Sequence, residues 1–316
     1  MRNIDLCRIL QVRVAFPSRR CQMRSHCEWF AGGIEWVMAG AKHADRIKPW
    51  GELPPGPLLR FVISLTRNLP ADAVGRWLAS LLYRLVSWNL DGPVDSHFVG
   101  AKVRLHSDGN GAEILALFTP DMYAPEERRL LAGMQRPDFT MVDVGANVGL
   151  FSLFAAACMD ESARIIAVEP DRELFRRLRF NIGASGTRTV TGQNLAISGD
   201  FDALVVMPES GGQPGDGTAV QGVTLVELMD QHGIDRLTVL NLGNTGQEFD
   251  TLSAFFIDAG RGRFPEVLMV MGQPSWPEAD PVRLAEMHGY RVVESKGEKT
   301  ILALSDIKAS QTTESV

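Results

Sequence analysis

The chain has 316 residues, of which 45% are apolar and 22% charged, values that are typical of a globular protein and exclude wholesale disorder. Its longest apolar stretch, Leu150–Met159, is shorter than the ~20 residues that a transmembrane helix needs. The net charge of −6 is unevenly distributed. Residues 1–90 are basic, with 13 Lys and Arg and 6 Asp and Glu, whereas residues 91–316 are acidic, with 19 Lys and Arg and 32 Asp and Glu. The acidic body argues against nucleic acid as a partner.

Residues 1–48 differ in composition from the rest, with nine Lys and Arg, four Asp and Glu and no sustained apolar period. They are interpreted as a disordered extension or as the result of a start assigned too far upstream, with a transit peptide as a further alternative. Because no apolar secretory core is present, we expect a cytoplasmic protein. Residues 306–316 are polar and are expected to form a flexible tail.

Residues 49–96 are predicted to form a helical appendage after a proline-rich linker. Two amphipathic helices are expected, with apolar stripes formed by Leu58, Leu59, Phe61, Val62 and Leu65 and by Trp77, Leu78, Leu81, Leu82, Leu85 and Val86. Arginines and the aromatic residues Trp77, Tyr83 and Trp88 fit peripheral membrane contact through residues 58–88. Packing of the same stripes on the main domain or on a second subunit is the alternative.

The main domain is predicted to span residues 97–305 and to open with a β-hairpin. Its strands are expected at Phe98–Leu105 and Glu113–Phe118, joined by a Gly- and Asn-containing turn. A helix should begin at Pro125, with two acids in its first turn, and end near Gly133.

From residue 140 onward, strands and helices alternate, which predicts an α/β fold with a doubly wound, mostly parallel, seven-stranded sheet. The strands are expected at Thr140–Val144, Arg164–Glu169, Thr189–Ala196, Leu237–Leu242, Glu266–Met271, Tyr290–Glu294 and Ile301–Leu304. The last two are joined by too short a loop for a parallel crossover, so the last strand should be a reversed, antiparallel edge strand. The Gly- and Pro-rich segment Ser210–Gly217 is interpreted as a surface loop.

The most informative motif is Met141–Phe151, in which a buried strand leads through a Gly-containing turn into a helix. Gly145 lets the backbone turn tightly, Gly149 lets a ligand approach the helix start, and the turn amides favour negative groups. The spacing is Gly-x-Asn-x-Gly and not the dinucleotide fingerprint Gly-x-Gly-x-x-Gly, and the strand ends in Asp143.

Asp143 and Glu169 together indicate the ligand. A carboxylate at the end of the first strand would face a pyrophosphate unfavourably but suits a cationic group such as the amino group of S-adenosylmethionine. Glu169 ends the next strand about 20 residues further on, where an acid accepts hydrogen bonds from two ribose hydroxyls. S-adenosylmethionine is therefore the predicted cofactor, and a nucleotide-binding oxidoreductase is the alternative. No zinc-like spacing of Cys and His occurs, so no metal is predicted.

The chain resembles the FkbM-type methyltransferases of the class I S-adenosylmethionine-dependent superfamily. The resemblance covers roughly Phe98 to Leu304 and is carried by Met122–Glu126, Val142–Ser152, Ala167–Asp171, Asn194–Ser198 and Gly246–Asp250. It implies methyl transfer to a hydroxyl oxygen of a small molecule or glycan. It also implies that Glu169 binds the ribose, that Asp171, Asn194 and Ala196 lie near the adenine, and that the methionine part contacts Asp143, Gly145, Ala146, Asn147 and Gly149.

The acceptor side departs from the family. Its members usually carry Lys-x-Asp-x-Glu-Gly-x-Glu after the fourth strand, where this chain has Asn241, Gly243 and Thr245 in place of the Lys, the Asp and the first Glu. Gly246 and Glu248 remain, and Glu248 is the candidate base, with a first-turn helix acid as the alternative. Met269, Met271, Phe249 and Trp276 are candidates for an apolar acceptor pocket. A non-enzymatic relative that keeps the cofactor site is the alternative function.

Overall fold

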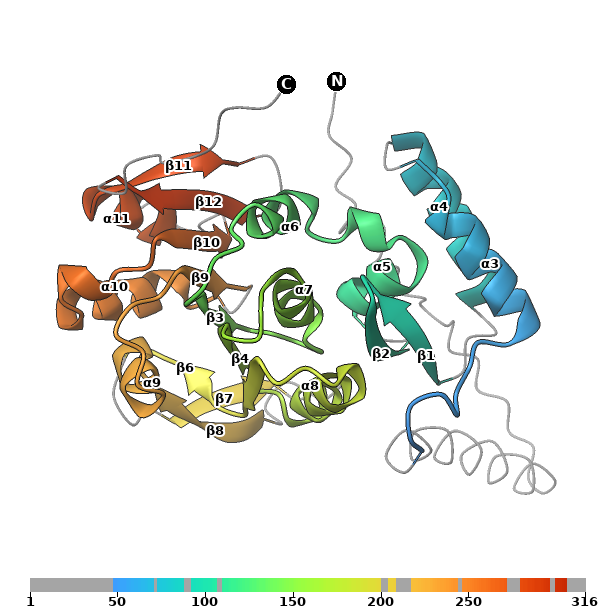
Figure 1. Ribbon diagram of the computed structural model, residues 1–316, viewed down its shortest axis with the longest axis horizontal. Helices are drawn as coiled ribbons and strands as arrows, with labels where there is room; N and C mark the ends of the chain where they lie inside the picture. The colour runs from blue at the N-terminus through green and yellow to red at the C-terminus, as the bar shows by residue number, and fades with distance from the viewer. Residues whose placement is uncertain are drawn as a thin grey trace, which may run out of the picture. The chain divides into compact units, whose positions relative to one another are not determined.

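The computed structural model describes residues 48–70, 73–87, 92–106, 110–199, 204–208, 217–243, 246–271, 279–295 and 299–305 (Figure 1). Some of the sequence predictions fall outside these ranges: those for residues 1–47, for the tail 306–316 and for Trp276 as a pocket residue.

A seven-stranded sheet with the order β11-β12-β10-β9-β3-β4-β5 forms the centre of the main domain (Figure 1). Its strands are β3 (Thr140–Val144), β4 (Arg164–Val168), β5 (Val190–Gln193), β9 (Val239–Leu242), β10 (Val267–Met271), β11 (Tyr290–Glu294) and β12 (Lys299–Leu304). The five strands from β5 to β10 are parallel, and β12 is antiparallel to both of its neighbours. This confirms the predicted fold class and the antiparallel last strand.

The predicted edge position of that strand is wrong, because β12 lies between β10 and β11 and the edge strand is β11. The burial of the side chains explains why β12, and not β11, is the internal strand. β12 presents buried residues on both faces, as an internal strand must, whereas Arg291, Val292 and Val293 of β11 are exposed.

Side-chain alternation along the strands divides the core into two layers. Met141 of β3 belongs to the apolar cluster that includes residues of α6 (Pro125–Ala132), α7 (Leu150–Cys158) and α8 (Arg172–Ser185). Val142 and Val144 belong to a second cluster, which includes residues of α9 (Leu225–Gln231), α10 (Glu248–Asp258) and α11 (Pro281–Met287). Helices therefore cover both faces of the sheet, as the alternating pattern predicts.

The predicted strand Glu113–Phe118 is wrong, because Gly111–Phe118 forms a helix, α5. The hairpin is instead made by β1 (Pro93–Phe98) and β2 (Ala101–His106), with positive φ at the two turn residues Val99 and Gly100. Asn110, expected in a turn, is the N-cap of α5, and its side chain accepts the Glu113 amide. The buried residues of α5 recur at helical spacing. In a short, mostly apolar run, however, the sequence pattern does not distinguish a helix from a strand.

The predicted strand Thr189–Ala196 is also divided. Its first part is β5 of the main sheet, and Ala196 begins β6 (Ala196–Ile197) in a separate sheet with β7 (Leu204–Pro208) and β8 (Gly217–Val223). The sequence interpretation missed β7 and β8. Of the predicted surface loop Ser210–Gly217, only Gly217 is described, and it begins β8.

The two expected amphipathic helices are present as α3 (Pro57–Arg67) and α4 (Ala73–Ser87). Val62, Ile63 and Val86 belong to the same apolar cluster as the hairpin and α7. Among the described residues, no helix combines the length and the apolar character that crossing a membrane requires.

A buried ion pair fastens the segment before α3 to the hairpin. Arg104 of β2 donates from Nε to Asp95 Oδ1 at 2.7 Å and from Nη2 to Oδ2 at 3.0 Å, and both side chains are 2% exposed. The guanidinium also donates to the Lys48 and Pro49 carbonyls, and Asp95 Oδ2 accepts the Gly51 and Leu53 amides. Each charge therefore has several hydrogen-bond partners, which offsets the cost of burying it.

We predict that Asp95→Asn lowers the free energy of unfolding by about 3–5 kcal/mol, because the Arg104 guanidinium stays buried without its counter-charge. Urea unfolding measures the change. The double variant Asp95→Leu/Arg104→Met should lose less than Asp95→Asn does, since no unpaired charge remains. Glu266→Gln, which breaks the more exposed pair with Arg136, is the control and should cost under about 1 kcal/mol. Equal losses in Asp95→Asn and Glu266→Gln would contradict the prediction.

Candidate functional site

The loop between β3 and α7 contains three residues in the left-handed region of backbone conformation. Gly145, Asn147 and Gly149 have φ values of 72°, 55° and 88°. Glycine adopts such values without steric cost, and asparagine is the side chain that tolerates them best. The alternation of these residues lets the chain fold tightly from the end of β3 into the first turn of α7.

The backbone amides of this loop all donate within the protein. Gly145 N and Ala146 N donate to Val168 O at 2.9 Å, and Gly149 N donates to Ala146 O at 2.9 Å. Asn147 N donates to Glu169 Oε2 and Val148 N to Asn147 Oδ1, both at 2.8 Å. The expectation that the turn amides favour a negative group is therefore wrong for residues 145–149, because these donors are already used.

Glu169 directly follows β4 and is 5% exposed. Its Oε2 accepts the Asn147 amide and its Oε1 accepts the Asp171 amide, at 2.8 and 2.9 Å. A carboxylate has about four acceptor positions, so each oxygen can accept a further hydrogen bond. Burial raises the pKa of Glu169 to about 7, against the opposing effect of the two amides.

Asp143 lies beneath the loop and is 1% exposed. Its Oδ2 accepts from Ser152 Oγ at 2.5 Å and its Oδ1 from Asn241 Nδ2 at 2.7 Å, while Asn241 Oδ1 accepts from Lys299 Nζ at 2.6 Å. Burial raises the pKa of Asp143, and the two hydrogen bonds and the Lys299 charge oppose that rise. A polar chain thus links α7, β3, β9 and β12.

Lys299 reaches this chain because β12 runs opposite to the parallel strands, so that its first residue lies at their carboxyl end. The sequence interpretation missed Lys299. It noted that Asn241 stands where the family carries a lysine, but not that a lysine distant in sequence approaches the same point. The contact between Lys299 and Asn241 depends on the order of the strands in the sheet. The one sequence signal for it was the short loop before β12, which predicted that this strand is antiparallel.

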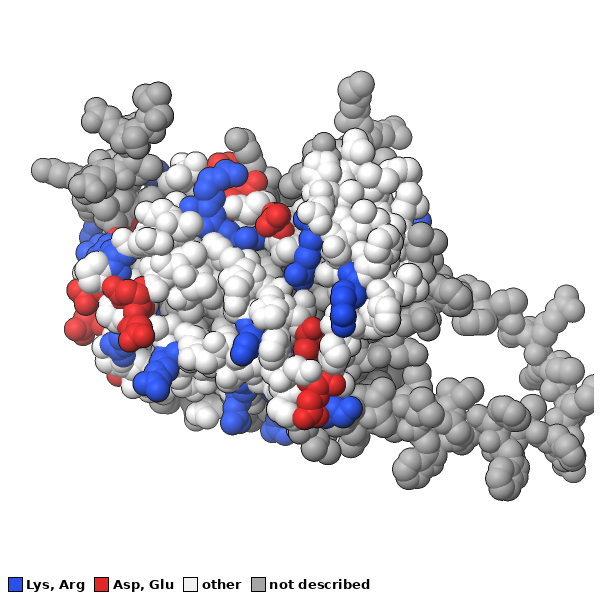
Figure 2. Space-filling view, turned by 45° about the vertical axis from the view of Figure 1, so that its right-hand side comes forward, with Lys and Arg blue, Asp and Glu red and all other residues white. Residues whose placement is uncertain are grey.

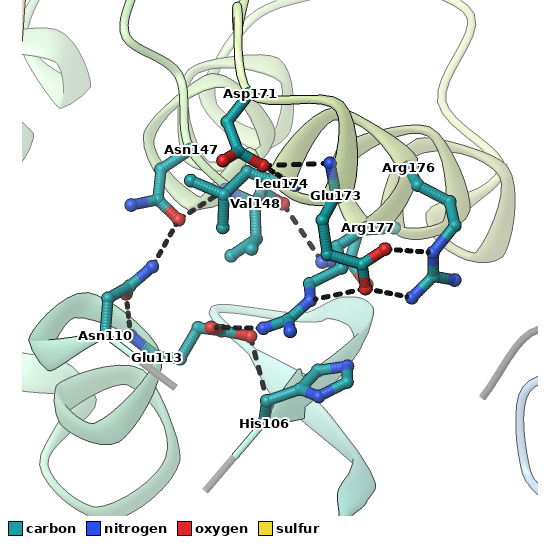
Figure 3. A network of polar contacts seen from close by, with 11 residues as sticks. His106, Asn110, Glu113, Asn147, Val148, Asp171, Glu173, Leu174, Arg176 and Arg177 are labelled. Carbon is teal, nitrogen blue, oxygen red and sulfur yellow. Dashed lines mark hydrogen bonds and ion pairs between the residues drawn. The ribbon is translucent and has the colours of Figure 1, made fainter. Parts of the chain in front are cut away.

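Asn147 also connects the loop to the hairpin region (Figure 3). Asn110 Nδ2 donates to Asn147 Oδ1 at 2.7 Å. Glu113, fully buried on α5, accepts the His106 amide at 3.0 Å and the Arg177 guanidinium of α8 at 3.1 Å. Burial raises the pKa of Glu113, and Arg177 is the main opposing influence. The start of α5 is therefore held against both the loop and α8.

Several predicted cofactor residues have structural contacts. The side chain of Asp171 caps α8 by accepting the amides of Glu173 and Leu174 at 2.8 Å, and Asn194 Nδ2 donates to the carbonyls of Glu169 and Pro170. Ala146 is 6% exposed, and Ala196 is 4% exposed within β6.

Gly149 lies against α8. A Cβ at this position would meet Leu178 Cδ1 at 2.4 Å, so the packing of α8 by itself requires a glycine here, and the approach of a ligand to the helix start stays a prediction.

Glu248 begins α10, which follows β9, and is 8% exposed, with Oε1 accepting the Gly246 amide at 3.3 Å. It therefore lies after β9, the strand adjacent to β3.

Three of the residues suggested for an apolar acceptor pocket are described. Met269 is fully buried in the core, so packing accounts for it, while Phe249 and Met271 are partly exposed. In the described part of the chain, no group of three His, Cys, Asp or Glu is placed to hold a metal ion.

No family model matches the chain. A 47-residue segment, 15% of the chain, is 49% identical to the AMB antimetabolite synthetase AmbE of Pseudomonas aeruginosa, and the match spans 2% of that protein.

Among solved structures, the chain is similar to methyltransferase FkbM from Methylobacillus flagellatus, with a TM-score of 0.37 and 12% identity over 73% of this chain and 59% of that one. It is also similar to TYW2 from M. jannaschii in complex with AdoMet, with a TM-score of 0.36 and 12% identity over 66% and 83%. A precorrin-6y C5,15-methyltransferase from Geobacter metallireducens gives a TM-score of 0.36 and 18% identity over 56% and 85%.

The raised pKa of Glu169 predicts a loss of stability with rising pH. Between the usual pKa of 4.5 and about 7, the folded state holds a proton that the unfolded state releases, so stability falls as pH rises through that window. The contribution amounts to about 3–4 kcal/mol at about 1.4 kcal/mol per pH unit. Glu169→Gln should remove it, giving a flatter profile than the native chain in urea unfolding between pH 4.5 and 7.5. Parallel profiles would show that Glu169 does not titrate in this range.

Proposed function

We propose that this chain is an S-adenosylmethionine-dependent methyltransferase. The observation that carries the proposal is the distribution of hydrogen-bonding capacity at the loop. The amides of residues 145–149 are satisfied internally, whereas Glu169 keeps acceptor capacity on both oxygens. A ligand that offers hydroxyl and ammonium donors fits this arrangement, and a pyrophosphate, which needs amide donors, does not.

Particular residues would hold the cofactor. Glu169 would accept the two ribose hydroxyls, and Asp143 and the loop Gly145–Gly149 would hold the methionine part. Asp171 and the Asn194–Ala196 turn form the adenine side. When bound, S-adenosylmethionine supplies a methyl group activated by the sulfonium charge.

The position of β12 also argues against a nicotinamide enzyme. The dinucleotide-binding sheet has the strand order 3-2-1-4-5-6. Here a reversed strand separates the fifth and sixth positions, which are occupied by β10 and β11. The amide and strand-order observations together favour the methyltransferase over the oxidoreductase alternative.

We propose that the acceptor is a hydroxyl of a small molecule or glycan and that Glu248 removes its proton. Glu248 lies at the carboxyl end of the sheet, beyond the β9 strand, where ligands meet open α/β sheets. Its Oε1 accepts the Gly246 amide, which orients the carboxylate. The match to a segment of an antimetabolite synthetase supports a small-molecule acceptor.

A binding protein without turnover is the second candidate, and Asn241 favours it. Asn241 is 2% exposed, and both its amide oxygen and its amide nitrogen are used within the protein, by Lys299 and Asp143. The Asn241 side chain therefore supports the Asp143 carboxylate and is not available to contact an acceptor. Turnover on any acceptor separates the two candidates.

We predict that Glu169→Ala weakens the binding of S-adenosylhomocysteine by about 10- to 100-fold or more, since each charged hydrogen bond lost costs about 1.5–3 kcal/mol. Isothermal titration calorimetry measures the affinity. Glu161→Ala, which removes an exposed carboxylate in the turn before β4, is the matched control and should bind normally. Unchanged affinity in folded Glu169→Ala would remove Glu169 from the site.

We predict that Glu248→Gln lowers turnover at least about 100-fold on the best acceptor from a panel of aromatic, lipid-like and sugar hydroxyls and one tRNA, because general bases contribute about that much. Cofactor affinity should be retained. Asp250→Asn, an exposed acid two residues along α10, is the control. Equal turnover in Glu248→Gln and the native chain would exclude the base role, and no turnover in either, with cofactor bound, would favour the non-catalytic candidate.

A further inference from the structure

Helices α3 and α4 expose large apolar side chains at matching positions. On each helix these residues stand at i, i+3 and i+7, so they form one stripe along that helix. They are 39–65% exposed and comprise Leu58, Phe61 and Leu65 of α3 and Val74, Trp77 and Leu81 of α4. We call these six residues the α3–α4 face.

The face belongs to helices whose other sides are packed. Val62 and Ile63 of α3 and Val86 of α4 are buried in the main cluster. Arg67 at the end of α3 donates to the Leu117 carbonyl of α5 at 3.0 Å and to the His97 carbonyl of β1 at 3.1 Å. The exposed stripe is therefore carried by helices that are anchored to the domain.

Charge indicates what this face contacts. Neither α3 nor α4 contains Asp or Glu, while Arg60 and Arg84 are exposed on them. In Figure 2 the surface over these helices is mainly white, with both blue and red side chains along its border. Residues 91–316, by contrast, hold 19 Lys and Arg against 32 Asp and Glu. Two helices that carry an apolar stripe and arginines, and that contain no acidic residue of their own, complement a lipid surface with an apolar interior and anionic headgroups.

We propose that the α3–α4 face docks on an anionic lipid surface, with Phe61 and Trp77 inserted at the level of the headgroups. A pair of basic amphipathic helices lying in the interface binds by buried apolar area together with attraction to anionic lipid. Aromatic rings, and tryptophan above all, are favoured at that depth. The proposal concerns where the protein acts and does not depend on the reaction it catalyses.

Co-sedimentation of the full chain with vesicles tests the proposal. We expect binding to vesicles of phosphatidylcholine with 30% phosphatidylglycerol (about one anionic lipid in three), weaker binding to phosphatidylcholine alone and a decrease with added salt. Phe61→Ser/Trp77→Ser should reduce binding at least about ten-fold, because two apolar anchors are lost. Ile257→Ser changes another exposed apolar residue, on α10, and should bind as the native chain does.

Fluorescence quenching by brominated lipids tests whether Trp77 enters the membrane. Brominated lipids should quench the native chain more than Trp77→Phe, since Trp77 is then the inserted tryptophan. Equal quenching in both proteins, or vesicle binding unaffected by Phe61→Ser/Trp77→Ser, would overturn the proposal. Absence of vesicle binding would overturn it as well, and sedimentation velocity would then show whether a second copy of the chain covers the face, as a dimer that Phe61→Ser/Trp77→Ser dissociates. Thermal melting of each variant checks that the domain stays folded.

Discussion

Two carboxylates end adjacent parallel strands in this protein, and the surrounding structure is arranged to compensate their burial. Asp143 and Glu169 stand at the carboxyl ends of β3 and β4, and both are nearly inaccessible to water. An unpaired buried charge would cost several kcal/mol. The tight loop supplies Asn147 N to Glu169, and α7 and β9 supply Ser152 and Asn241 to Asp143. The Asn147 amide of the loop, the Ser152 and Asn241 side chains and, through Asn241, Lys299 of the reversed strand thus oppose part of the rise in pKa that burial causes at these two carboxyl groups.

Local sequence patterns predicted the elements that carry this site because those elements are defined by residues close in sequence. The apolar runs of β3 and β4 and the glycines of the loop between β3 and α7 are short-range features, and they appear where expected. The helix α5 was mistaken for a strand because its eight residues are mostly apolar, and over that length the two periods give similar patterns.

The part that sequence reasoning missed is non-local. Lys299 and Asn241 are 58 positions apart, and they meet only because the β10–β12 pairing brings the start of β12 to the carboxyl edge. The use of the Gly145, Ala146 and Asn147 amides was equally hidden, since it depends on the Val168 carbonyl of β4 and on the Glu169 carboxylate that follows β4. The amides of residues 145–149 thus have partners within the protein, whereas the Glu169 carboxylate keeps acceptor positions, and this difference is visible only in the folded structure.

The same contacts that build the site connect it to the rest of the domain. Helix α5 packs beside α3, and its N-cap residue Asn110 donates to Asn147 in the loop. Glu113 on α5 is bonded to Arg177 of α8, the helix whose Leu178 fills the space beside Gly149. The loop is thus positioned from two sides, by α5 and by α8. Helix α5 contacts both the loop and α3, and it therefore forms one of the connections between the glycine-containing loop and the α3–α4 face; Arg67, which donates to the His97 carbonyl of β1, and the Arg104–Asp95 pair form others.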